Sequence, residues 1–221
     1  MPHRKTDRDA VIDAALELFR TRGYHHTSVA EIAAACGLLK GSVYHYFAGK
    51  QEIAAAALDR AIADSRQKIF GLAGDPAVPP PQRLRNLADA VERYFAGREG
   101  GCLMGSLALE VGDSIPEFRD RVQRYFDDWK AALAAVLEGR YGAARAGELA
   151  EDAIARAQGA ILLMEVTKDP AVLQRACRDT VALLEGGALL DGQALPEGDK
   201  SIVAGSPGAA REQLEPWKEA S

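Results

Sequence analysis

The stretch TSVAEIAAACGLLKGSVYHYF, residues 27–47, contains two short helical patterns joined by a glycine, the arrangement of a helix-turn-helix. Thr27 or Ser28 is expected to cap the first helix, with Glu31 three residues after Ser28 as in a capping box. Gly37 is expected to end that helix, because glycine adopts left-handed backbone angles without steric cost. The stretch therefore predicts two helices meeting at a tight corner.

The second half of this stretch places cationic, hydroxyl and aromatic groups on a short helix that begins near Lys40. Such groups suit phosphates and base edges better than a protein core. The alternative is an ordinary helical hairpin whose aromatic residues fill a core, and for Phe47 that alternative is preferred. Leu38 and Leu39 are expected to close the corner hydrophobically.

Charge is distributed unevenly along the chain. The net charge of −5 over 221 residues argues against a polyanionic partner, but residues 1–50 hold seven basic and five acidic side chains. The remaining residues therefore carry a net charge of −7. A mildly basic head on an acidic body is typical of a two-part molecule in which only the head meets a nucleic acid.

Composition excludes several protein classes. A hydrophobic content of 48% can build a substantial core, while no apolar run reaches the roughly 18 to 20 residues of a membrane span. The N-terminus lacks the apolar segment of a signal peptide, so we expect a cytoplasmic protein. Three widely spaced cysteines and four histidines without metal-ligand spacing predict no disulfide framework, metal or cofactor.

Outward from this stretch, hydrophobic periodicity predicts only helices, and hence an all-α fold. The expected helices cover about 7–23, 50–72, 82–98, 102–111, 116–141, 147–168 and 170–190. The predicted domains are a DNA-binding head (1–50), a ligand-binding and dimerisation body (51–195) and a loose tail (196–221). Broad small-residue faces on the last two helices favour a four-helix bundle between two subunits, although one chain alone could cover them.

A family resemblance rests on the residues of the head. They are Ala14-Ala15-Leu16, Leu18-Phe19, Gly23-Tyr24, Thr27-Ser28-Val29, Ile32-Ala33, Gly37, Lys40 to Phe47, and Lys50. In these positions the chain resembles the DNA-binding domain of the TetR family of bacterial transcriptional regulators. Leu39, where a small or polar residue is common, and the imidazole-rich Tyr24-His25-His26 depart from the pattern.

The resemblance implies where DNA is contacted. Thr27 and Lys50 are expected on phosphates, and the recognition helix is expected to carry most of the other contacts. The predicted DNA-binding set is Thr27, Ser28, Lys40, Gly41, Ser42, Tyr44, His45, Tyr46 and Lys50. A homodimer is expected to bind a pseudopalindromic double-stranded operator and, as a repressor, to release it when a small-molecule effector binds.

A set of apolar residues with a few polar tips is predicted to line the effector pocket in the body. The set is Tyr94, Phe95, Cys102, Met104, Tyr125, Trp129, Gln158 and Met164. For each of them taken singly, plain core is the alternative. An alternative for the whole protein is a helical carrier or enzyme without sequence-specific DNA binding, although no cofactor loop, carboxylate pair or activated nucleophile is recognisable.

Cys102 follows two glycines at the expected start of a helix, where the free amides favour a thiolate. Residues 101–107, GCLMGSL, also resemble a branch of the family with NemR-like and AcuR-like members. In that branch a cysteine at this point is linked to electrophile sensing in some proteins. The alternative is a small buried hydrophobe, as expected for Cys36 and Cys177.

Overall fold

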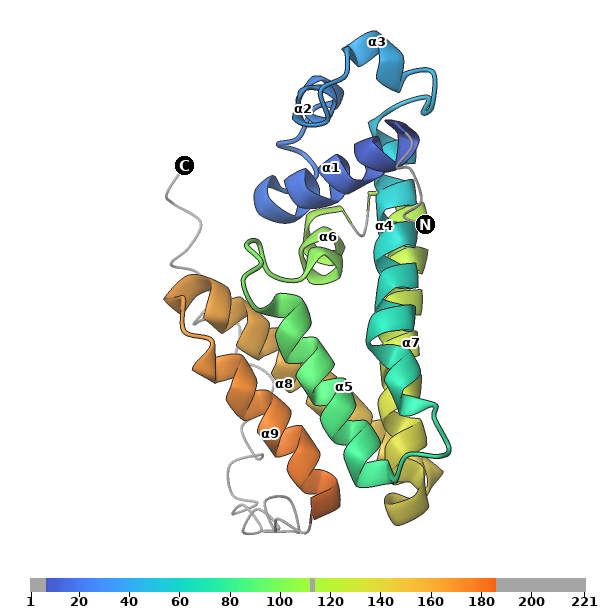
Figure 1. The fold of residues 1–221 in the computed structure, drawn as a ribbon, viewed down its shortest axis with the longest axis vertical. Helices are drawn as coiled ribbons and strands as arrows, with labels where there is room; N and C mark the ends of the chain where they lie inside the picture. The colour runs from blue at the N-terminus through green and yellow to red at the C-terminus, as the bar shows by residue number, and fades with distance from the viewer. Residues whose placement is uncertain (1–6, 112–113, 186–221) are drawn as a thin grey trace, which may run out of the picture. The chain divides into compact units, whose positions relative to one another are not determined.

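The computed structural model describes residues 7–111 and 114–185 (Figure 1). Within these residues the chain is helical and contains no strand, which confirms the predicted all-α class. The elements are α1 (Asp7–Arg22), α2 (Val29–Ala35), α3 (Lys40–Val43), α4 (Lys50–Lys68), the 3-10 helix η1 (Phe70–Ala73), α5 (Pro80–Phe95), α6 (Leu103–Val111), α7 (Pro116–Tyr141), α8 (Ala143–Thr167) and α9 (Ala171–Glu185).

Several predicted helix bounds need correction. The connector expected over 50–72 ends as an α-helix at Lys68 and continues as η1. Helix α5 begins earlier than expected, since Pro80 occupies a first-turn position where the missing N–H costs nothing. Helix α8 already begins at Ala143, and Ser114 does not cap α7, whose N-cap is Ile115. The predicted tail and residues 186–190 lie outside the described residues.

Helices α1, α2 and α3 form the head. Helix α1 turns Val11, Ala15 and Phe19 inward, where they are buried together with Ile32 of α2 and Val43 of α3. None of these short helices could bury its apolar face alone, so α1 also packs along α4.

Helices α4 to α9 form the body. Helices α4 and α7 run side by side, while α5 packs on α9 and α8 lies against both α7 and α9 (Figure 1). The centre is aromatic: the Phe70 ring lies 5.4 Å from Tyr125 and 6.0 Å from Trp129, measured between centroids. This filled centre leaves the space for ligands nearer the head.

Candidate DNA interface and effector cleft

The corner between α2 and α3 forms as the sequence predicts. The Ser28 hydroxyl accepts a hydrogen bond from the Glu31 N–H at 3.2 Å, and the Glu31 carboxylate accepts one from the Ser28 N–H at 2.8 Å. This capping box holds the Glu31 carboxylate in its ionised form and lowers its pKa. Gly37 follows with a left-handed φ of 70°. The helix-turn-helix is therefore set by local hydrogen bonds.

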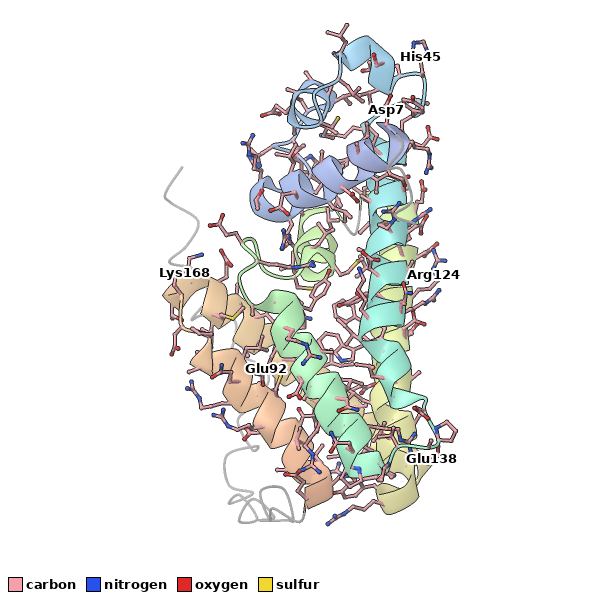
Figure 2. The ribbon with its side chains drawn as sticks, in the orientation of Figure 1. Asp7, His45, Glu92, Arg124, Glu138 and Lys168 are labelled. Carbon is pink, nitrogen blue, oxygen red and sulfur yellow. The ribbon has the colours of Figure 1, made fainter. Side chains whose placement is uncertain are left out.

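The predicted recognition helix is shorter than expected. Helix α3 ends at Val43, and residues 44–46 continue as turns in which the Tyr46 and Phe47 N–H groups both donate to the Val43 carbonyl oxygen. Lys40, Gly41, Tyr44, His45 and Tyr46 are exposed there. Figure 2 shows His45 at the outer end of the head, pointing away from the body.

Side chains in this segment are arranged as one surface. The Lys40 ammonium lies 6.0 Å from the centre of the Tyr44 ring, and Tyr44 is 48% exposed. Ser42 is half-buried beside them. The Tyr46 hydroxyl donates to the Asp7 carboxylate at 3.4 Å, which ties this turn to the start of α1. A cation, hydroxyls and an imidazole thus fall within one short segment with mostly exposed side chains, which we call the α3 surface (residues 39–46).

Three of the residues predicted to contact DNA lie outside the α3 surface. Thr27 is only 1% exposed, because its hydroxyl donates to the Gly23 carbonyl at 2.9 Å. The Ser28 hydroxyl is engaged in the capping box. The Lys50 ammonium donates to the Tyr24 carbonyl at 3.0 Å and lies 4.3 Å from the centre of its ring. All three side chains make contacts within the head, and their contact with DNA stays a prediction.

Leu39 was not predicted as a surface residue. Instead of closing the corner, it is 80% exposed at the N-cap of α3, and only Leu38 packs partly on the core. The sequence did contain a signal for this exposure, because Leu39 departs from the small or polar residue that is usual at its position. Apolar side chains at such points contact thymine methyl groups in major grooves.

A cleft of about 700 Å³ lies where the head meets the body, and we call it the junction cleft. Its volume is in the range of small-molecule sites. Its walls come from the end of α1, the loop before α6, α6 itself, α7 and α8. The lining residues are Arg20, Thr21, Gly100, Gly101, Cys102, Gly105, Ser106, Ala108, Leu109, Phe126, Gln158, Gly159, Ile161, Leu162 and Glu165.

The eight predicted pocket residues are divided between the junction cleft, the packed core and a second cleft, and their contact with a ligand stays a prediction. Only Cys102 and Gln158 line the junction cleft. Phe95, Met104, Tyr125 and Trp129 are at most 3% exposed, because they fill the centre of the body. Met164 is partly buried against the same core. Tyr94 faces a separate cleft of about 540 Å³ with Arg98 stacked on its ring.

Cys102 lies in the wall of the junction cleft, half-buried. Burial raises the pKa of its thiol, although the Gly105 and Met104 amides and the Gln158 side chain act in the opposite direction. Desolvation therefore outweighs the helix terminus, and the thiol is not activated at neutral pH. Cys177 is buried, with its pKa raised to about 12 by burial and the nearby Glu92. The Cys36 thiol donates to the Ile32 carbonyl at 3.1 Å.

The raised pKa of Cys102 has a kinetic consequence. Iodoacetamide should alkylate Cys102 at pH 7.5 more slowly than it alkylates free cysteine, because a smaller fraction of the thiol is ionised. The rate should still be rising at pH 9, since the pKa of this thiol is above its ordinary value. Mass spectrometry of tryptic peptides, with Cys102→Ser as the blank, measures this rate. An alkylation rate that stops rising below pH 9 would contradict the raised pKa of the Cys102 thiol.

Two body segments hold the end of α1 and the loop that follows it. The Glu110 carboxylate, on α6, accepts hydrogen bonds from the Tyr24 N–H at 2.8 Å and the His25 N–H at 2.6 Å. At Gly100 the backbone lies so close to α1 that an added Cβ would be 2.2 Å from the Arg20 carbonyl oxygen. Neither residue was predicted to join the two parts, and the only signal was the glycine run before Cys102.

Within residues 7–111 and 114–185, no group of three or more His, Cys, Asp or Glu side chains is placed to hold a metal ion. Among the same residues, no helix is both long and apolar enough to span a membrane.

Comparison with known proteins agrees with this geometry. Residues 11–57 match the family model described as "Bacterial regulatory proteins, tetR family", and residues 80–180 match "Tetracyclin repressor-like, C-terminal domain". The HTH-type transcriptional repressor DhaR of Mycobacterium sp. (strain GP1) is 30% identical over 168 residues, which cover 73% of this chain and 84% of DhaR.

Two further relatives extend the match over the body. The transcriptional regulator AcuR of Cereibacter sphaeroides is 30% identical over 182 residues, 76% of this chain and 82% of AcuR. A TetR transcriptional regulator from Chloroflexus aurantiacus has a crystal structure that superposes with a TM-score of 0.70 at 28% identity, covering 81% of this chain and 94% of that one. These matches set aside the carrier or enzyme alternative. The chain belongs to the TetR family and is a DNA-binding transcriptional regulator.

Proposed function

We propose that this chain is a dimeric repressor that releases its operator when a small molecule occupies the junction cleft. The observation that carries the proposal is the wall of the cleft, which includes Arg20 and Thr21. Both belong to α1, a helix of the head. A molecule in the cleft therefore touches the DNA-binding part directly, and DhaR, a relative of similar length, is named a repressor.

DNA recognition is assigned to the α3 surface, residues 39–46. Its exposed Lys40 suits a phosphate, while Tyr44 and His45 present polar tips to base edges. Two acidic side chains of α1 share one cation, since Arg60 of α4 lies 2.5 Å from the Asp9 carboxylate and 3.4 Å from that of Asp13, while the Asp7 carboxylate accepts the Tyr46 hydroxyl. The α3 surface is thus the part of the head best suited to a polyanion.

Release follows from the spacing of two heads. In a dimer the two α3 surfaces must lie about 34 to 36 Å apart, or a multiple of this distance, to enter successive major grooves. Glu110 and Gly100 fix the end of α1 to the cleft walls, so a molecule that separates these walls moves the head. A ligand that binds better to the displaced state lowers operator affinity, and the operator lowers ligand affinity equally.

A gel-shift titration tests the assignment of the α3 surface. Lys40→Ala and Tyr44→Ala should each weaken binding to DNA from beside the chain's own gene by about 1–3 kcal/mol, roughly 5- to 150-fold. Lys40→Ala should also flatten the salt dependence, because one phosphate contact is lost. The matched control is Lys68→Ala, which removes an exposed lysine from the end of α4, far along the chain from α3.

Sedimentation of the same variants separates two explanations. Operator binding should fall while the dimer persists, because Lys40 and Tyr44 are exposed. A parallel loss of dimer would show that the substitutions act through the fold. No sequence-specific, salt-dependent shift with the unsubstituted protein would overturn the proposal itself.

A further inference from the structure

The chemistry of the junction cleft restricts what it can hold. This inference rests on the proposed function, since it concerns the ligand of the same cleft. Most of the lining is apolar or glycine, with Leu109, Phe126, Ile161 and Leu162 as the large apolar side chains. A ligand of this site must therefore be largely apolar, and its polar groups must meet the few polar atoms in the wall.

Gln158 supplies one such polar atom from the middle of α8. Its Nε2 is buried, and the Cys102 sulfur, a weak acceptor, is the group of the described residues that it interacts with. Its Oε1 packs against α6 at Gly105, where an added Cβ would lie only 3.2 Å away. The oxygen end of the amide is thus held against α6, and the nitrogen end has no oxygen or nitrogen acceptor. A buried amide donor without a full-strength acceptor loses up to about 1–3 kcal/mol, part of which a bound carbonyl would recover.

Arg20 supplies the second unpaired donor. Its side chain is 12% exposed, and one guanidinium nitrogen, Nη2, pairs with the Glu17 carboxylate. The other, Nη1, is buried without a partner in the described residues. Among the cleft-lining side chains, the buried unpaired nitrogen and oxygen atoms of the described structure are therefore both donors. A ligand that pairs with these donors must carry a hydrogen-bond acceptor.

Charge decides which kind of acceptor fits. Glu165 lines the same cleft and stays ionised, because hydrogen bonding to Lys168 lowers the pKa of its carboxyl. Glu17 accompanies Arg20. Each carboxylate is thus paired with a cation, Glu17 with Arg20 and Glu165 with Lys168, so these side chains carry no net charge and favour neither an anionic nor a cationic ligand. A neutral carbonyl oxygen supplies the acceptor without adding a charge.

We infer that the junction cleft binds a small, mainly apolar molecule carrying a neutral carbonyl group, whose oxygen accepts a hydrogen bond from Gln158 Nε2. The apolar part lies against Phe126, Ile161 and Leu162. Binding needs no bond to the Cys102 sulfur, whose thiol stays protonated in the wall.

Matched probes test the role of Gln158. The pair is 4-phenylbutan-2-one and butylbenzene, which differ by a carbonyl in place of a methylene, and dissociation constants come from isothermal titration calorimetry. The preference for the ketone over the hydrocarbon should fall about 10-fold in Gln158→Leu, since removing one buried neutral hydrogen bond costs about 1–2 kcal/mol. Gln67→Leu, an exposed glutamine at the end of α4, should leave it unchanged.

A second variant and a cationic probe complete the experiment. Gln158→Met repeats the test with an unbranched side chain should the leucine variant fold poorly, and 4-phenylbutan-2-amine should bind at least 10-fold more weakly than the ketone. An unchanged ketone preference in both variants, or no binding of either neutral probe, overturns the inference. Operator release is measured in the same solutions. Gln158-dependent ketone binding without release would leave the inference standing and overturn the proposed function.

Discussion

Gly100→Ala should lower the free energy of unfolding by about 2–5 kcal/mol. The left-handed conformation at this position, with φ of 85°, costs a side-chain-bearing residue about 1–2 kcal/mol. The added Cβ would also lie 2.2 Å from the Arg20 carbonyl oxygen and 3.0 Å from the Thr21 Cα. Both are backbone atoms that cannot rotate away, and overpacking of this kind costs about 1–3 kcal/mol more.

Gly97→Ala is the matched control. Its φ of 70° carries the same conformational cost, but nothing lies within 4 Å of an added Cβ. Urea denaturation of both variants should therefore separate the backbone cost, about 1–2 kcal/mol, from the clash with α1. Equal losses in the two variants would mean that the loop before α6 does not press on the end of α1.

Local signals predicted the head and the helices well. The capping box at Ser28 and Glu31 and the left-handed Gly37 depend on neighbouring residues alone, so the sequence contains all that is needed to find them. The same is true of α7, whose bounds, Pro116–Tyr141, are those predicted from hydrophobic periodicity. The prediction that Leu39 closes the corner was wrong, because an apolar residue beside a turn can face either the core or the solvent.

The predicted pocket residues differ from the lining of the junction cleft for a physical reason. Periodicity tells which face of a helix is buried, but not whether the buried face meets another side chain or an open space. Tyr125 and Trp129 lie on an inward face and are packed against Phe70. The junction cleft forms instead where glycines such as Gly101, Gly105 and Gly159 leave room. Small residues therefore indicate the junction cleft better than aromatic ones do.

The broad faces of α8 and α9 predict that the two subunits of a dimer meet there. Substitutions on this face are expected to have a large effect on dimer stability. Leu163 and Val166 are 53% and 74% exposed near the end of α8, where single-chain packing leaves them uncovered. An apolar strip of this kind on a helix that already packs along α9 is suited to the same strip of a second copy. The structure describes α9 only to Glu185, so the predicted dimer face beyond it stays a prediction.

The double variant Leu163→Glu with Val166→Glu should weaken the dimer more than 100-fold. A two-fold interface through this strip would bring the four new carboxylates of the two copies into one buried region, and burying unpaired like charges costs several kcal/mol, of which each 1.4 kcal/mol is tenfold. Sedimentation equilibrium measures the dimer, and operator affinity should fall with it, because one α3 surface alone contacts a single half-site. Leu39→Glu, the same change at an exposed leucine of the head, should leave the dimer intact. A dimer that survives the double variant would place the subunit contact on another face.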